Sequence, residues 1–177
     1  MAEEWIELGV VVAKRALKGP WASYQWLPVA VLPAPAAAAP WTALGCSGSD
    51  TTFYAGAFAL GLHSSATGHY RDNLGSARPS LWVALRPAGE ERVEVVAVTA
   101  DPYEGELLAD NPGDVVDAVP LPAELRTRID AFFAAHHVER TFYKRERKRA
   151  DPEALARRGP ARPAVEDPDR PAVEDDE

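Results

Sequence analysis

The stretch IELGVVVA at residues 6–13 decides the fold class, because a run of apolar and β-branched residues is typical of a strand. Gly19-Pro20 ends this strand, and a second apolar run follows at residues 21–32. Pro28 interrupts the second run. Since proline cannot donate a hydrogen bond to a neighbouring strand, we expect this strand to lie at a sheet edge or to carry a bulge at Pro28.

Residues 33–40 have prolines at both ends, which favours a stiff extended connector rather than a helix. A short strand is expected at 41–44, followed by a Gly/Ser loop at 45–50. The next run, 52–63, alternates with a period of two and predicts a strand. We expect one of its faces to carry large side chains and the other to carry Phe53 and the alanines at 55, 57 and 59, with Gly56 and Gly61 at bulges or points of close packing. The large side chains of the first face are Tyr54, Phe58, Leu60 and Leu62.

The second half of the chain predicts two further strands and a helix. Strands are expected at 81–85 and 93–99, joined by a hairpin-length loop, and a short helix is expected at 104–110. The clearest helix is 122–137, which has one apolar face. Together these elements indicate an α+β fold, mainly one antiparallel sheet covered by this late amphipathic helix. The apolar face is formed by Leu125, Ile129, Phe132, Phe133 and His136.

Charge divides the chain into three segments. The predicted α+β domain is 1–138, and its first 137 residues hold 9 Lys/Arg and 16 Asp/Glu. A basic extension covers 139–158, a range with 8 Lys/Arg and 4 Asp/Glu. The acidic tail 159–177 repeats the sequence RPAVED at 162–167 and 170–175. Its proline and acid content leaves little to bury, so we expect the tail to be disordered.

Composition excludes several classes of protein. No apolar run approaches the roughly 20 residues that span a bilayer, so no membrane association is expected. The N-terminus is acidic where a signal peptide would be basic, and we expect a cytoplasmic protein. An acidic body disfavours nucleic-acid binding, which depends on cationic groups. The single Cys46 excludes an internal disulfide framework and cannot by itself hold a metal.

Four histidines are candidates for chemistry, but no nucleophile, base and orienting group come together in the sequence. His63 and His69 flank a turn and could build a small polar site with Asp72. His136 lies on the apolar helix face, which is typical of a core residue. His137 lies near the helix C-terminus, where the dipole favours it. No metal site is expected.

Two segments stand out as possible binding elements. The first, 69–79, is predicted as a long polar loop with the residue types that recognise an anion or a partner backbone: Tyr70, Arg71, Asn73 and Arg78. Its alternative is a packed loop with Tyr70 and Leu74 tucked beneath it. In the second segment, 142–149, two aromatic residues are followed by six residues of which five are cations. The segment begins with Phe142, Tyr143, Lys144 and Arg145. Its alternative is a solvated charge run without a function.

Several motifs in order resemble a small uncharacterised family encoded in proteobacterial formate dehydrogenase gene clusters. Members are often labelled molybdopterin-guanine dinucleotide biosynthesis protein A. The similarity covers roughly residues 8–158 and excludes the acidic tail. The motifs are GPW at 19–21, WLPVAVLP at 26–33, FYAG at 53–56, YRDNL at 70–74, RPSLWV at 78–83, VTADP at 98–102, HHVER at 136–140, FYKR at 142–145 and RADP at 149–152.

The resemblance implies an accessory protein for assembly or maturation of a molybdenum or tungsten formate dehydrogenase, acting by binding. The implied partner is the apoenzyme or another maturation protein. No resident cofactor is expected. Transient contact with a molybdopterin-type cofactor is a possibility that the resemblance implies. One alternative is a nucleotidyltransferase of molybdenum cofactor biosynthesis, although no glycine-rich phosphate loop follows the first strand. Another is an interaction module unrelated to molybdenum.

Overall fold

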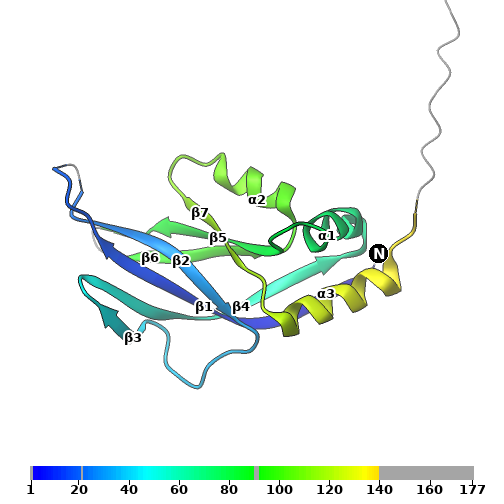
Figure 1. Ribbon diagram of the computed structural model, residues 1–177, viewed down its shortest axis with the longest axis horizontal. Helices are drawn as coiled ribbons and strands as arrows, with labels where there is room; N and C mark the ends of the chain where they lie inside the picture. Colours follow the sequence, from blue (N-terminus) through cyan, green and yellow to red (C-terminus); the bar gives the residue numbers. More distant parts are fainter. Residues whose placement is uncertain (1, 21, 90–91, 140–177) are drawn as a thin grey trace, which may run out of the picture. The chain divides into compact units, whose positions relative to one another are not determined.

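The computed structural model describes residues 2–20, 22–89 and 92–139 of the chain. This part contains seven strands, a short 3-10 turn (η1) and three helices (Figure 1). The basic extension from residue 140 and the acidic tail lie outside the described residues, so both stay predictions. In chain order the elements are β1 (Glu3–Ala16), β2 (Tyr24–Leu32), β3 (Thr42–Ser47), β4 (Asp50–His63), η1 (Ser64–Ala66), α1 (Thr67–Leu74), β5 (Ser80–Pro87), β6 (Val93–Thr99), α2 (Pro102–Ala109), β7 (Val115–Pro120) and α3 (Ala123–His136).

The strands divide between two antiparallel sheets, so the α+β class is confirmed but the single expected sheet is not. The first sheet has the order β2-β1-β4-β3 and the second the order β6-β5-β7. Strand β2 lies against β7, and β4 lies against β6. The core forms between the sheets and continues under α1 and α3. It includes Leu8 and Val10 of β1, Val83 of β5 and Ile129 of α3.

Pro28 has the effect that the sequence predicts. Strand β2 is an edge strand, and its pairing with β1 shifts beside Pro28. Val11 pairs with Ala30 whereas Val12 pairs with Pro28, so one extra residue bulges out of β2. Both expectations for this strand are confirmed.

A second bulge, at Gly56, makes the predicted faces wrong for the first part of β4, whereas Leu60 and Leu62 lie in the core with Phe58 packed against it, as predicted. Val10 pairs with Gly56 and Val11 with Tyr54, which leaves Ala55 as the extra residue. Gly56 has a φ of 132°, a backbone conformation that residues other than glycine rarely adopt. Because a bulge reverses the alternation, Ala55 joins the core while Tyr54 turns to the other face of the sheet.

Gly61 marks close packing, as expected. A Cβ atom there would lie 2.9 Å from the Trp5 ring. Helix α3 follows the prediction for its inner residues, since Leu125, Ile129 and Phe132 are buried. Two outer residues differ: Phe133 is half-buried and His136 is exposed. Strand β7 was not predicted; it is a short strand, half of it exposed, that completes the second sheet beside β5.

An ion pair ties the end of β5 to the start of β7. The Arg86 guanidinium donates two hydrogen bonds to the Asp114 carboxylate, at 2.7 and 2.8 Å. These bonds from Arg86 hold the pKa of Asp114 below its ordinary value. The pair therefore loses its stabilising effect only as the pH falls through that lowered pKa.

Helix α2 packs on the outer face of the second sheet through a glycine. A Cβ atom at Gly105 would lie 2.4 Å from the Trp82 ring of β5, so the helix needs glycine to approach this closely. Gly68 in α1 is different, because a Cβ atom there would meet nothing within 4 Å.

We expect Gly105→Ala to lower the free energy of unfolding by about 1–2 kcal/mol. Alanine gains about 1 kcal/mol of helix propensity, but overpacking against Trp82 costs about 2–3 kcal/mol, the upper part of the usual range, because the Cβ atom would lie only 2.4 Å from the ring. The control Gly68→Ala should raise the free energy of unfolding by about 0.5–1 kcal/mol, since only the helix propensity of that position changes. Chemical denaturation of both variants checks this, and a stabilised Gly105→Ala variant would show that α2 does not pack on Trp82.

Candidate functional site

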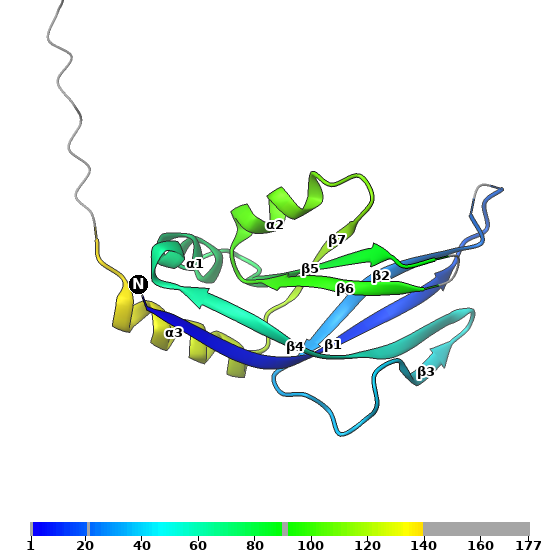
Figure 2. The same cartoon turned by 180° about the vertical axis from the view of Figure 1, so that it is seen from behind.

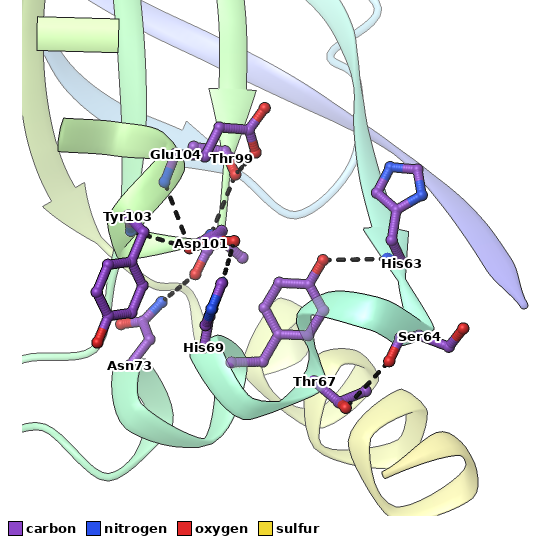
Figure 3. A network of polar contacts seen from close by, with 11 residues as sticks. His63, Ser64, Thr67, His69, Asn73, Thr99, Asp101, Tyr103 and Glu104 are labelled. Carbon is purple, nitrogen blue, oxygen red and sulfur yellow. Dashed lines mark hydrogen bonds and ion pairs between the residues drawn. The ribbon is translucent and has the colours of Figure 1, made fainter. Parts of the chain in front are cut away.

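The predicted loop at 69–79 is wrong in its secondary structure, because residues 67–74 form the helix α1. No side chain caps its first turn. Contacts to other elements hold the helix instead, and these contacts build the candidate site. The site lies between α1, the end of β6 and the start of α2 (Figure 3).

Asn73 is the centre of this arrangement. Its side chain is 4% exposed and makes three hydrogen bonds, all of them to the backbone. The amide nitrogen donates to the carbonyl oxygens of Ser80 and Ala100, at 2.8 Å each, and the amide oxygen accepts from the N–H of Ser80 at 3.0 Å. One side chain therefore fixes α1 to the start of β5 and to the end of β6.

Asp101 provides the second connection. One carboxylate oxygen caps α2 by accepting from the N–H groups of Tyr103 and Glu104. The other lies 2.6 Å from Nδ1 of His69 in α1. Thr99 supports the same turn, because its hydroxyl accepts from the N–H of Asp101 and donates to the Glu104 carboxylate. We call Asn73, His69, Asp101 and Thr99 the polar clamp.

His69 is the member of the polar clamp that reaches the surface. Its side chain is 44% exposed, and its ring lies 4.5 Å from the Tyr103 ring, centroid to centroid. A carboxylate on Nδ1 fixes the orientation of the imidazole. Within the described part of the chain, Nε2 makes no hydrogen bond, so it is available to a ligand or to water.

Tyr70 lies beneath this surface rather than on it. Its ring is 2% exposed, and its hydroxyl accepts a hydrogen bond from the N–H of His63 at 3.0 Å. Burial raises the pKa of Tyr70 above its ordinary value, because a buried phenolate would lose its hydration. Leu74 is also buried, so the packed alternative is confirmed for these two side chains.

The remaining candidates of this segment are exposed. Arg71 lies next to Asp72, with which it forms an exposed ion pair at 3.2 Å, and Arg78 lies in the turn after α1. Arg78 also borders a hollow of about 390 Å³ between α1 and α2. The hollow is lined by Asp72, Asn73, Ser76, Arg78, Trp82, Pro102, Tyr103 and Glu106.

Among the described residues, His63, His69 and Asp72 form no hydrogen bond or ion pair with one another, so the polar site suggested by the sequence does not form. His69 binds Asp101 rather than Asp72. Nδ1 of His63 lies 3.5 Å from a carboxylate oxygen of Glu3, and the His63 ring makes an edge-to-face contact with the Trp5 ring. His137 is the C-cap residue after α3, and its Nδ1 lies 3.1 Å from the Thr67 hydroxyl. Asp101 escaped sequence reasoning because it is 32 positions from His69. The Asp101-Pro102 pair is nevertheless a helix start signal, which could have drawn attention to it.

Other expected features have these outcomes. Cys46 is exposed, with its sulfur 3.6 Å from the Thr51 hydroxyl. Within residues 2–20, 22–89 and 92–139, no group of three or more His, Cys, Asp or Glu side chains could hold a metal ion. None of the helices in these ranges is long and apolar enough to cross a membrane. Phe142, Tyr143, Lys144 and Arg145 lie outside the described residues.

We expect Asn73→Ala to lower the free energy of unfolding by about 2–4 kcal/mol. The change leaves two carbonyls and one N–H without their partner, and each buried unpaired group costs about 1–3 kcal/mol, with partial relief from water. The control is the neighbouring Asp72→Ala. It should change stability by no more than about 0.5 kcal/mol, because it removes only an exposed ion pair. Equal stabilities in thermal unfolding would contradict the polar clamp.

Comparison with known proteins identifies the family. Residues 7–147 match the model of the family described as "Protein of unknown function (DUF3305)", and the chain belongs to that family. No curated protein and no solved structure is similar enough to match.

Proposed function

We propose that this protein is an accessory protein for the assembly or maturation of a molybdenum- or tungsten-dependent formate dehydrogenase, and that it acts by binding. The resemblance to proteins of formate dehydrogenase gene clusters supports the choice of enzyme. The surface over α1 and α2 supports binding as the mode of action. The proposal places the protein in the cytoplasm.

The observation that carries the proposal is the rigid exposed surface that the polar clamp holds in place. Arg71 of α1, Arg78 of the turn after α1, and Tyr103 and Leu107 of α2 are exposed, the last two to 52% and 71%. Short helices are marginally stable by themselves. A partner that docks on a surface already ordered by Asn73 and Asp101 loses less conformational entropy.

The chemistry of this surface favours a partner with an anionic group beside apolar side chains. Arg78, whose side chain forms no ion pair with another described residue, can donate paired hydrogen bonds to a carboxylate or a phosphate, whereas Arg71 already pairs with Asp72. Tyr103 and Leu107 supply apolar area next to them. We propose that this anion belongs to the apoenzyme or another maturation protein, or transiently to the phosphate of a molybdopterin-type cofactor.

A pair of charge reversals tests the surface. We expect Arg78→Glu to reduce co-purification of formate dehydrogenase with the tagged chain at least fivefold, because it places a negative charge where the partner's anion binds. Lys18→Glu is the matched control, since it reverses an exposed charge far along the chain from the polar clamp. Both variants should unfold at the temperature of the unaltered chain.

Two results would contradict this proposal. If the Arg78→Glu variant retains formate dehydrogenase as strongly as the Lys18→Glu variant does, the α1–α2 surface does not contact the enzyme. Failure of the unaltered chain to retain any formate dehydrogenase would favour an interaction module unrelated to molybdenum.

The basic segment gives an independent expectation. Replacing Lys144, Arg145, Arg147, Lys148 and Arg149 by serine should leave folding intact and weaken formate dehydrogenase activation in cells. The reason is that clustered cations steer association with an anionic partner. Full activation at normal protein levels would show that the segment is only a solvated charge run.

One observation favours a second candidate, an enzyme of molybdenum cofactor biosynthesis such as a nucleotidyltransferase. The His69 imidazole is oriented by Asp101 and opens to solvent, an arrangement that suits general acid–base chemistry. Incubation with nucleotide and pterin substrates tests it. Turnover that His69→Gln abolishes would support the enzyme over the accessory protein.

A further inference from the structure

The two sheets have unequal numbers of strands, and this leaves one position of the second sheet empty. Strands β2 and β4 lie against β7 and β6 of the second sheet. Among the described elements, strand β3 makes extensive contact only with β4. All six of its residues are exposed. A fourth strand next to β6 would therefore lie over β3.

A pocket of about 510 Å³ occupies this end of the two sheets. Figure 2 shows β3 and the start of β6 at the same end. On the side of the first sheet the pocket is lined by Trp26, Trp41 and Phe53, and on the other by Ala88, Arg92, Val93 and Glu94. Its volume is in the range of known binding pockets, about 300–1,000 Å³.

The aromatic residues form a continuous wall. The ring centroids of Trp26 and Trp41 are 6.0 Å apart, and those of Trp26 and Phe53 are 5.5 Å apart. Trp41 is 39% exposed, although burial of such a ring is strongly favourable. Trp26 and Phe53 are half-buried, so the wall reaches solvent mainly through Trp41, and an accessible aromatic surface beside a pocket is typical of an interaction site.

Two further features show that this wall is held at a cost in free energy. Trp41 has a φ of 66°, a left-handed conformation that is unfavourable for a bulky residue. Its N–H donates to the carbonyl oxygen of Tyr54 at 2.5 Å, which holds the backbone there. The indole N–H of Trp26 is buried and has no hydrogen-bond partner within the described residues. Costs of this kind are concentrated at binding sites.

The backbone of β6 offers hydrogen bonds at this position. The N–H of Ala88 donates to the carbonyl of Arg92, so Arg92 faces β5 across the hairpin. Backbone groups alternate in direction along an antiparallel strand. The N–H and C=O groups of Val93 and Val95 therefore point to the free edge of β6, because β6 pairs with β5 alone among the described strands.

We propose that an extended basic segment of a partner protein pairs with the free edge of β6, as a fourth strand of the second sheet, and places an apolar side chain against Trp41 and Phe53. Strand addition of this type takes its affinity from backbone hydrogen bonds and its specificity from side-chain pockets. The inference goes beyond the proposed function, since it does not depend on which enzyme is the partner.

Charge decides between a basic partner segment and a second copy of the chain. Arg92 and Glu94 both line the pocket and are exposed, so the charge that decides is that of the described body, which has more acidic than basic residues. Two copies paired through β6 would bring two acidic bodies together, which is unfavourable. A basic segment gains from the same charges.

The test uses a nine-residue synthetic peptide in which lysine alternates with valine and the central residue is leucine. We expect it to bind the full chain and to slow the amide exchange of Val93 and Val95 at least tenfold at saturation. The same peptide with glutamate in place of lysine should bind at least tenfold more weakly. Methylation of the backbone nitrogens on the edge that faces β6 should abolish binding, whereas methylation of the opposite edge should not.

Variants of the chain test the aromatic wall. Trp41→Ala should weaken binding of the lysine peptide at least tenfold, because it removes the exposed part of the wall. Trp5→Ala is the control, since Trp5 is 61% exposed and is not among the pocket residues. The methylated peptides act on the unaltered chain, so they decide the question even if Trp41→Ala does not fold.

Three results would overturn the proposal. The first is equal binding of the two N-methylated peptides, which would exclude backbone pairing with β6. The second is equal binding of the lysine and glutamate peptides. The third is a stable dimer in sedimentation with Val93 and Val95 protected before any peptide is added, which would identify a second copy as the occupant.

Discussion

Burial of β1 on both faces is the constraint on which the rest of the structure depends. Residues 8–13 are all buried, so both faces of the sheet at β1 must be covered by other parts of the chain. On one face Val10 and Val12 pack into the core beneath the second sheet. On the other face Gly9 lies directly under the Tyr54 ring, where a Cβ atom would come within 2.9 Å. The Tyr54 hydroxyl in turn accepts from the N–H of Ala36, so the connector between β2 and β3 is fixed over β1.

The polar clamp depends on the same core, because it connects the elements that close one end of the sheets. Asn73 and Asp101 are both nearly buried, and each serves two elements at once. Polar groups buried in this way confer little net stability, but their loss is costly. Their effect is to fix the position of α1 and α2. The proposed contacts of Arg78 and Tyr103 with a partner follow from that position.

Strand type and the α+β class could be predicted from the sequence, since they depend on local composition and on Pro28. The faces of β4 before Gly56 could not, because the bulge there arises from the pairing of β4 with β1. Helix α1 was missed because it lacks a side-chain cap and a strong apolar face, and is stabilised by contacts with distant residues. For the same reason the sequence pointed to Asn73 as a surface residue although it is buried, and it left two alternatives open for Tyr70. It did not reveal Asp101 or the pocket of Trp26, Trp41 and Phe53.

The central claim is that a well-packed body, built around β1, leaves the edge of β6 open for a partner. Amide hydrogen exchange of the unliganded full chain measures this most directly. The amides of Val93 and Val95 should exchange much faster than that of Glu94, which faces β5, and faster than those of β1. Protection of Val93 and Val95 equal to that of Glu94 would contradict the account, because it would show that the edge is already covered.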